Sequence, residues 1–519
     1  MIRNPILKRA ERGVMISATA TMQAPVGGWN TRDSIADMKQ ADAIWLENWW
    51  PDASDVSMRK GAESFATGLG DAVKAVMGHT SPTSAKLFAA TDSGIYDVTA
   101  GGAVGSSLLA ITNGELRYER FTVAGGTFLI AVNGQDKLAQ YDGTSWQFID
   151  GATTPSITGL TTSDISNLAV FKERLWFVEK DSMSAWYLPV RQVGGAAVEF
   201  PLGQLFSRGG HLVAIGNWTI DSGSGADDFI IFVTSEGEVA AYQGTDPSTA
   251  STFALVGVYY IAPPIGPRCF TKFGGDLLLL TKAGLFPMSK ALLSSGLDHK
   301  TAVSDKIAPT LSQAAVSYEA LTGWMLAVIP QENMLLVNVP TLEGYSSNQL
   351  VMNTITKSWA LFTGWNAFCW EVWQGKAYFG GNGFVAKALV GNEDFGADIV
   401  AKGRTAFNYF NSQKIKHVKM LRPVLSSNGN FSVDFGIDVD FEDIDTTTTL
   451  SVAAPTVFEW DAATWDSALW AAEQAVQRNW RTVSAKTGFC ISLRLRIAAK
   501  GVNVRWNSTD FLYQRGGVL

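Results

Sequence analysis

The sequence predicts a mainly β protein: a six- or seven-bladed β-propeller with an additional β-rich domain formed by the two chain ends. Three observations predict this class. Pairs of short apolar runs joined by a turn recur, the recurrence has about the length of one propeller blade, and aromatic residues are plentiful. The 519 residues include 50 Gly, 18 Trp and 28 Phe, whereas charged residues make up 17%, below the ~25% of typical soluble proteins. This composition excludes a disordered chain, a coiled coil and a collagen-like fibre.

The repeated unit is a β-prone apolar run, a polar or Gly-containing turn, and a second run that carries an aromatic residue. It occurs between residues 86 and 385, with runs that start at residues 86, 127, 174, 228, 276, 333 and 376. The starts are 41 to 57 residues apart, and four-stranded blades occupy about 40–50 residues. The alternative is a Gly-rich all-β chain with irregularly spaced hairpins. The period favours the propeller.

One segment, residues 291–315, interrupts the repeats with a helical texture. Ser304 and Asp305 are suited to cap a short helix there. Its apolar face would carry Ile307, Leu311 and Ala314. We therefore expect a helical insertion or a connector between blades.

The chain ends differ from the repeats and suggest three parts. We expect an N-terminal docking segment at residues 1–75, the propeller at 76–395, and a C-terminal β domain at 396–519 that packs with the N-terminal segment. The C-terminal part has two alternating strands, one with acidic residues on its polar face (434–442) and one with Arg494 and Arg496. If they pair, opposite charges would face each other.

Charge and hydropathy limit the possible partners. Lys and Arg number 41 against 48 Asp and Glu, a net charge of −7, so no general positive field would hold nucleic acid. The apolar runs are far shorter than the ~20 residues that span a bilayer, so we expect no stable membrane insertion. The basic first residues lack a secretory h-region, which predicts synthesis in the cytoplasm.

The three cysteines, widely separated, are expected to be buried free thiols.

The sequence lacks the common motifs of catalysis and cofactor binding. It has no phosphate-binding loop, no GxSxG nucleophile elbow and no GxGxxG before a helix. The four histidines are scattered, and the acidic run near Asp438 lacks the Gly and terminal Glu of a calcium loop. We therefore predict no catalytic residues, no cofactor, no metal and no enzymatic activity.

Three segments that are far apart in the sequence carry a resemblance to a known family. The first is residues 25–61, with GGWNTRD and NWW. The second joins GLFPMS at 284–289 to VSDKI at 303–307. The third runs from WDAATWD at 460–466 through RWNSTDF at 505–511 to 517. Together these segments resemble the tail nozzle or hub proteins of short-tailed bacteriophages, also called packaged-DNA stabilisation proteins. Because they lie at the start, middle and end, the resemblance covers essentially the whole chain.

The resemblance implies a structural virion protein in the viral tail, assembled in the host cytoplasm. It implies a homohexameric ring below the portal and a head-to-tail adaptor protein, with a bore that retains the packaged genome until ejection. Tail fibres or spikes would dock around the ring, and a tail needle or plug would close its exit. Genomic DNA would pass through the channel without specific binding, which suits the acidic balance of the chain.

Two groups of residues are candidates for these roles. The first is predicted to fasten the N-terminal block to the ring or the adaptor, or else to form an ordinary folded core: Trp29, Asn30, Arg32, Asp33, Trp49 and Trp50. The second is predicted to line the channel, with a solvated strand face as the alternative: Asp434, Asp438, Asp440 and Glu442. Two other functions stay open. One is a glycan-binding propeller whose repeated aromatics stack on sugars, and the other is a propeller glycoside hydrolase, which needs convergent carboxylates.

Overall fold

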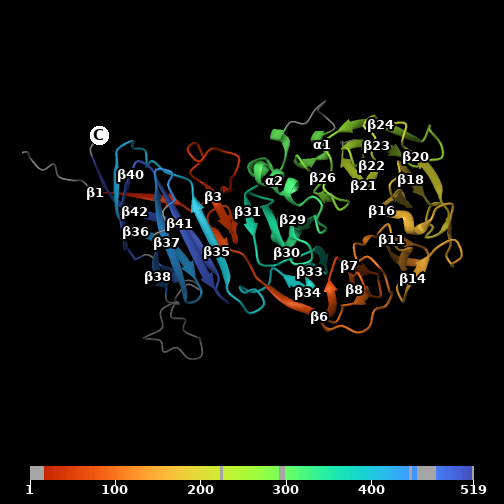
Figure 1. Ribbon diagram of the computed structural model, residues 1–519, viewed down its shortest axis with the longest axis horizontal. Coiled ribbons are helices and arrows are strands. Elements are labelled where there is room, and N and C mark those ends of the chain that lie inside the picture. The colour runs from red at the N-terminus through yellow and green to blue at the C-terminus, as the bar shows by residue number, and fades with distance from the viewer. Residues whose placement is uncertain are drawn as a thin grey trace, which may run out of the picture.

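The computed structural model describes residues 17–221, 226–291, 299–443, 447–452, 475–477 and 479–516. Segment 460–466, which contributes to the family resemblance, lies outside these residues. The described chain is mainly β and has two regions, a ring of small sheets and an end domain (Figure 1). This confirms the predicted mainly β class.

The ring consists of small, mostly antiparallel sheets built from strands that follow one another in the chain, an arrangement typical of a β-propeller. Five of these sheets follow one another in the chain. The first contains β7 (Ala75–Thr80), β8 (Ala85–Thr91) and β9 (Gly94–Asp97). The second contains β11 (Arg117–Val123), β12 (Gly126–Val132), β13 (Leu138–Tyr141) and β14 (Trp146–Ile149). The third contains β16 (Ile165–Phe171), β17 (Arg174–Glu179), β18 (Ser184–Tyr187) and β20 (Val198–Pro201). The fourth contains β21 (Leu212–Asp221), β22 (Ala226–Thr234), β23 (Glu238–Gly244) and β24 (Phe253–Tyr260). The fifth contains β25 (Phe270–Phe273), β26 (Asp276–Thr281) and β27 (Gly284–Pro287). A parallel pair, β15 (Ile157–Thr158) and β19 (Gly195–Ala196), lies outside them.

Two further groups of strands complete the ring. The first is β28 (Met325–Ile329), β29 (Met334–Leu342), β30 (Ser346–Asn353) and β31 (Trp359–Phe362). The second is β32 (Cys369–Trp373), β33 (Lys376–Gly380) and β34 (Asn382–Ala388), which β6 (Ala62–Ala72) and β10 (Gly102–Ala103) extend. Because β6 precedes the ring in sequence and pairs with β34, it joins the first and last parts of the ring.

Contacts between neighbouring strand groups of the ring, made mainly by the first strand of each group in chain order, return to their starting point. Strand β7 contacts β11, β11 contacts β16, β16 contacts β21, β21 contacts β26, β25 contacts β28, β28 contacts β32, and β32 contacts β7. Each repeat start predicted from the sequence lies within two residues of the start of a second strand: β8, β12, β17, β22, β26, β29 and β33. The predicted recurrence of paired runs is therefore confirmed.

Aromatic residues of the repeats fill the spaces between neighbouring sheets. The ring centroids of Phe88 and Trp146, from β8 and β14, lie 5.2 Å apart. Those of Trp176 and Phe253, from β17 and β24, lie 5.8 Å apart. Since each narrow sheet has two apolar faces, stacking against its neighbours removes both from water.

The end domain has two facing sheets made of strands from both chain ends. One sheet contains β1 (Ser17–Gln23), β4 (Trp49–Pro51), β5 (Val56–Met58), β36 (Lys416–Ser427), β39 (Ala475–Gln477), β40 (Arg481–Gly488) and β42 (Val504–Arg515). The other contains β2 (Gly28–Trp29), β3 (Asp42–Glu47), β35 (Ile399–Thr405), β37 (Phe431–Val439), β38 (Thr448–Val452) and β41 (Ile491–Ala499). This second sheet continues through the β3–β31 pair into β28–β31, so one ten-stranded sheet belongs to both regions.

The predicted boundary at residue 75 does not coincide with a structural one. Strands β1 to β5 pair within the end domain or with β31, whereas β6 already belongs to the ring. The chain therefore enters the ring at Ala62, at the start of β6. The apolar strand pattern of β6 was not recognised as part of the repeats because its partner β34 lies more than 300 residues away.

The helical interruption contains α1 (Met288–Ala291) and α2 (Ala308–Tyr318). Leu311 and Ala315 are the buried residues of α2. Ser304 makes no capping hydrogen bond. Instead, its hydroxyl accepts a hydrogen bond from the Leu285 amide at 3.0 Å, so the predicted cap is wrong because β27 already uses this oxygen. Four short 3-10 turns are also present among the described residues: Thr162–Asp164, His299–Thr301, Asp305–Ile307 and Pro330–Glu332.

Candidate functional site

The N-terminal block, residues 25–61, lies between the ring and the end domain and contacts both. On the ring side, Lys306 Nζ donates to Asp42 Oδ1 and to the Gly27 carbonyl oxygen, each at 2.8 Å. Asp42 is only 1% exposed, and its other oxygen accepts from Asn30 Nδ2 at 2.8 Å. Lys306 therefore balances a buried carboxylate of the block.

Two further contacts fix the block to the same connector, residues 303–307. Arg32 forms an ion pair with Asp305. The amides of Thr31 and Arg32 donate to the Lys306 carbonyl oxygen at 2.9 and 3.2 Å. Side-chain and backbone contacts thus fix the position of the N-terminal block relative to the connector.

On the other side, the block packs against the end segment, residues 505–516. Strand β5 pairs with β42 through Arg505 and Trp506. The ring centroids of Trp49 and Trp506 lie 5.9 Å apart. A Cβ at Gly403 would lie 2.9 Å from the Trp506 ring, so this pair of tryptophans requires glycine beneath it. We call the meeting of the N-terminal block, the connector and the end segment the junction.

Arg59 is a second enclosed charge of the junction, at 2% exposure. Its guanidinium binds Asp394 through both carboxylate oxygens, at 2.5 and 2.9 Å. The remaining N–H groups donate to Asn48 Oδ1 and to the carbonyl oxygens of Lys60 and Thr363. The guanidinium carbon lies 4.5 Å from the Trp365 ring centroid. Such complete satisfaction is what a buried charge requires.

The structure covers several predicted docking residues with their own chain. Trp29, Asn30 and Trp49 are at most 3% exposed, so their side chains pack within their own chain, as the folded-core alternative expects. That these residues help fasten the N-terminal block to the ring or the adaptor stays a prediction. Arg32 and Asp33 are partly exposed and pair with each other at 2.7 Å. Hydrogen bonds from Arg32 and Asn30 lower the pKa of Asp33 to about 2. Trp50, half-buried, packs on Phe362.

The acidic strand of the end domain, β37, pairs with the basic strand, β41. Asp434 lies opposite Arg496 in the β37–β41 register, and their charged groups are 3.2 Å apart. Asp438, however, is fully buried and receives Arg404 at 2.9 Å and Arg494 at 3.0 Å. Channel lining is therefore wrong for Asp438, because two guanidiniums cover its carboxylate.

The other two acidic candidates lie beyond the end of this strand. Strand β37 ends at Val439, and Asp440 and Phe441 have φ values of 50° and 68°. One oxygen of Asp440 accepts from the Phe489 amide at 2.7 Å and the Cys490 amide at 3.0 Å. Asp440 and Glu442 are exposed. The sequence predicted that the strand continues through Asp440 and Glu442, because acidic and apolar residues still alternate in this turn.

A second site lies on the axis of the ring, where residues of β7, β11, β16, β21, β25, β28 and β32 line one hollow of about 260 Å³. Its walls carry apolar residues and a few charged or polar ones. The polar members are Arg117, Tyr118, Glu119, Asn167 and Arg268. A concave, partly apolar site with few convergent polar groups is the usual form of a small-molecule site.

Tyr118 and Arg120, on β11, reach towards Glu371 on β32. The Tyr118 hydroxyl donates to Glu371 Oε2 at 2.5 Å, and Arg120 Nη2 donates to Oε1 at 3.3 Å. Burial raises the pKa of Glu371 to about 7, against the lowering effect of these bonds. A Cβ at Gly78 would lie 2.9 Å from Glu371 Oε1. The absence of a side chain at Gly78 therefore leaves room for the Glu371 carboxyl group.

Glu119 lies on the opposite face of β11 from Tyr118, because side chains alternate along a strand. Burial raises the pKa of Glu119 to about 7, opposed by the charges of Lys272 and Arg120. Glu119 and Glu371 therefore lie on different sides of β11. They do not form one convergent pair.

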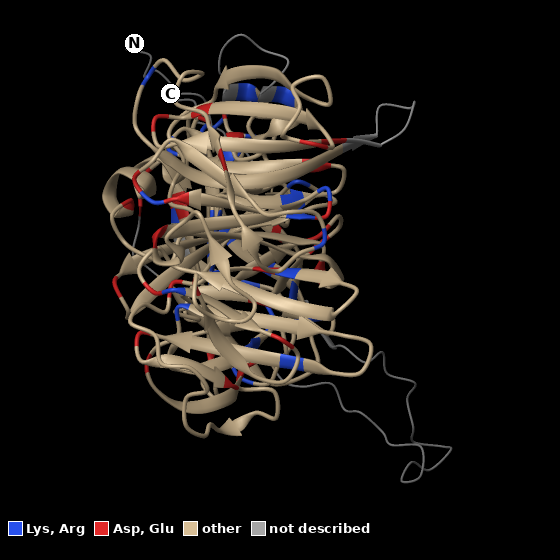
Figure 2. Ribbon diagram, turned by 90° about the vertical axis from the view of Figure 1, so that its right-hand side faces the viewer, with Lys and Arg blue, Asp and Glu red and all other residues tan. Residues whose placement is uncertain are grey.

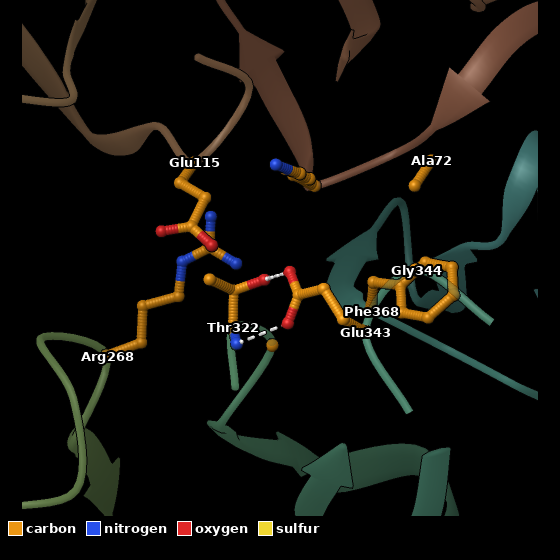
Figure 3. Close-up of a pocket in the computed structure, with 9 residues that line it drawn as sticks. Ala72, Glu115, Arg268, Thr322, Glu343, Gly344 and Phe368 are labelled. Atoms are coloured by element: carbon orange, nitrogen blue, oxygen red, sulfur yellow. Dashed lines mark hydrogen bonds between the residues drawn. The ribbon is translucent and has the colours of Figure 1, made fainter. Parts of the chain in front are cut away.

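One mouth of the ring has a smaller pocket, which shares Arg268 with the axial hollow (Figure 3). Arg268 precedes β25 and points towards Glu115, which precedes β11. Nearby, Glu343 accepts hydrogen bonds from the Thr322 amide and hydroxyl. Glu115, Arg268 and Thr322 lie just before β11, β25 and β28, which are the first strands of their groups in the ring. The segments that lead into these strands therefore meet at this mouth.

The described residues contain no group of His, Cys, Asp and Glu that would hold a metal ion. None of the helices among them has the length and hydropathy to cross a membrane. Cys269, Cys369 and Cys490 are buried and free, as predicted. Burial raises the pKa of Cys269 to about 12 and that of Cys369 to about 11, so both thiols are unreactive at neutral pH.

Comparisons with known proteins show no family. No family model and no curated protein matches the chain. A structure of BBS1N in complex with ARL6DN has 9% identity and a TM-score of 0.38, and covers 63% of this chain and 96% of that one. A structure of YCF48 bound to D1 peptide has 11% identity and a TM-score of 0.36, with coverages of 63% and 94%. Both are β-propeller folds, but likenesses this low carry no argument about function.

Proposed function

We propose that this protein is a structural component of a viral tail, a homohexameric nozzle or hub that continues the DNA channel below the portal and adaptor. One observation carries the proposal. The three segments that resemble the tail nozzle family are far apart in sequence, yet their described parts meet at the junction. Three independent resemblances would not be expected to fall on one contiguous structural element by chance.

The ring itself is proposed to be a seven-bladed β-propeller. The first strands of seven successive strand groups line the axial hollow, and contacts between neighbouring groups form a closed series. A hollow of about 260 Å³ has room for a small molecule and not for a DNA duplex. A channel for the genome would therefore run between subunits of the hexamer and not through the propeller axis.

In this role the protein binds an adaptor above, fibres or spikes around its outside, and a needle or plug below. DNA passes without specific binding. Figure 2 supports this last point, because Lys and Arg as well as Asp and Glu are scattered over the ribbon, and the basic residues do not gather in one positive region. Balanced charge does not retain a polyanion by counterion release. The protein would be assembled in the host cytoplasm and reside in the virion.

Strand β24 is the surface proposed for contact with the next subunit. It is the outermost strand of its sheet and pairs only with β23 among the described residues. Leu255, Val256, Val258 and Tyr260 are 37–45% exposed, and the strand has no charged residue. An apolar free edge of this kind associates readily with another chain. In a hexamer a second copy would cover it.

Light scattering on the purified full chain tests the assembly. We expect a mass six times that of the 55.9 kDa chain. Val256→Lys and Val258→Lys should give a monomer, since each would place a charge in the contact, while Val316→Lys on α2, at a residue that is 81% exposed, should leave the hexamer intact. A wild-type monomer at all concentrations would refute the proposal.

The alternative functions find less support. The aromatics of the repeats that were expected to stack on glycans lie in the cores between sheets, and Trp146, Trp176 and Trp359 are at most 7% exposed. A hydrolase needs two convergent carboxyl groups, and Glu119 and Glu371 face different sides of β11. We therefore propose that the protein is not an enzyme.

A further inference from the structure

Arg117 and Arg268 both line the axial hollow, and the described chain uses only part of the hydrogen-bonding capacity of Arg117. Arg268 Nη2 donates to the carbonyl oxygen of Leu116 at 2.9 Å, and Leu116 directly precedes Arg117. Burial, together with the nearby positive charge of Arg268, lowers the pKa of Arg117 to about 10, although the charge of Glu115 opposes this shift. We call Arg117 and Arg268 the arginine pair.

The donors of Arg117 are only partly used. Its Nη1 donates to the Glu115 carbonyl oxygen at 3.1 Å, and its Nη2 lies 3.9 Å from Glu115 Oε2. Its Nε is buried and has no hydrogen-bond partner. The side chain as a whole is only 15% exposed, so water has little access to this donor. A buried guanidinium N–H without an acceptor is costly, and a ligand anion would supply that acceptor.

The remaining wall of the hollow suits an organic molecule. Its apolar side is formed by Leu168, Ile215, Phe270, Met325 and Leu326. On the polar side, Glu119 lies two residues from Arg117 on the same face of β11, about 7 Å along the strand. No hydrogen bond or ion pair of the Glu119 side chain is present within the described chain. An anionic group at the arginine pair would leave the ligand body among apolar side chains, with Glu119 beside it.

We propose that the axial hollow binds a small organic carboxylate, with its carboxylate group against Arg117 and Arg268 and its body against the apolar wall. Guanidinium and carboxylate match as paired donors and acceptors. A phosphate monoester, with its greater charge, is disfavoured because the Glu115 carboxylate lies 3.9 Å from Arg117 Nη2. This site is independent of assembly, since it lies within one chain.

Calorimetric titration of the full chain tests the site, with acetate, lactate and benzoate as carboxylate probes. Benzamide serves as the neutral analogue of benzoate, and phenyl phosphate as the phosphate analogue. We expect saturable binding of at least one carboxylate at concentrations up to about 10 mM. No binding of any carboxylate, equal binding of benzamide, or tighter binding of phenyl phosphate would overturn the proposal.

Variants locate the site. Arg117→Gln and Arg268→Gln should each weaken carboxylate binding about tenfold or more, because each removes a charged hydrogen-bond donor. Arg191→Gln is the matched control, since Arg191 pairs with Glu173 on the surface, and its affinity should equal that of wild type. Ile215→Phe keeps both arginines but fills the hollow from its apolar side, and should also abolish binding. Circular dichroism verifies folding of each variant. Unchanged affinity in Arg117→Gln or Ile215→Phe would refute the assignment.

Discussion

The ring and the end domain are built in opposite ways. Each small sheet of the ring uses mainly consecutive strands, and aromatic side chains fill the gaps between sheets. The end domain pairs strands from the two ends of the chain, as in the β1–β42 register, where Ser17 faces Gln514. Because local pairings need little loop closure and non-local ones need much, the two regions differ in how far they depend on specific long-range contacts.

Buried charges show the same contrast. The junction contains enclosed ion pairs between residues hundreds of positions apart, such as Arg59 with Asp394 and Lys306 with Asp42. In the ring, surface pairs such as Arg191 with Glu173 lie 18 residues apart. The first kind specifies which distant segments meet, whereas the second contributes little to stability.

The largest expected effect comes from Arg59→Met. It would leave Asp394 without its bidentate partner and should lower the free energy of unfolding by about 3–5 kcal/mol. Urea unfolding measures this loss. Arg191→Met, which breaks a surface pair, should cause no measurable change. Equal stability of the two variants would contradict the contrast between junction and ring surface.

The ring should lose stability as pH rises from 5 to 8. Burial raises the pKa of Glu371 from 4.5 to about 7, so the folded chain holds this proton more tightly than the unfolded chain. The resulting stabilisation is complete below the unfolded pKa and is lost as pH rises through about 7. It amounts to about 3 kcal/mol for one such group.

Glu371→Gln isolates this contribution in urea unfolding measured at several pH values. We expect a smaller decline in stability between pH 5 and 8 than in wild type. Some decline should remain, because burial raises the pKa of Glu119 in the same direction. Glu332→Gln, at a partly exposed residue that pairs with Lys60, is the control. The same pH profile in wild type and Glu371→Gln would show that Glu371 titrates normally.

The link between ring and end domain is tested by Lys306→Met. The substitution leaves the Asp42 carboxylate buried without its cation and should cost about 1–3 kcal/mol, moderated because Lys306 is partly exposed. The double variant with Asp42→Asn should recover part of this loss. A double-mutant cycle measures the coupling, and strict additivity would mean that the ion pair does not join the two regions.

The smallest effect compares two glycines. Gly403→Ala places a Cβ 2.9 Å from the Trp506 ring and should cost about 1–2 kcal/mol by overpacking. Gly275→Ala, in the β25–β26 turn, meets no atom within 4 Å and should leave stability within about 0.5 kcal/mol of wild type. Thermal unfolding followed by circular dichroism distinguishes them. An unaffected Gly403→Ala variant would show that Trp49 and Trp506 can move apart.

The strand pairs of the ring were predictable because the residues that form each pair are close in sequence. A turn such as Glu236–Gly237 and the apolar runs on either side lie within one hairpin, so the sequence itself displays the pairing. Strand β6 was not identified, because its partner β34 follows the whole ring. The burial of Asp438 was missed for the same reason, since Arg404 and Arg494 reach it from two other strands.

The candidate sites were less predictable than the fold. Local sequence singled out Trp29 and Trp49 by their residue type, and type alone did not distinguish a buried core from a docking surface. Nothing near Arg59 or Lys306 in sequence indicates a buried ion pair, although both fall within the segments that carry the family resemblance. The arginine pair of the hollow joins residues 117 and 268 across the ring axis, a proximity that follows only from closure of the ring.

Electron microscopy of the purified full chain tests the central proposal most directly. The account predicts particles with six copies around an open channel, each copy presenting a disc-shaped ring joined to a second β-rich lobe. Particles that contain one disc alone, or rings whose axis is closed by the protein, would contradict a passage for packaged DNA.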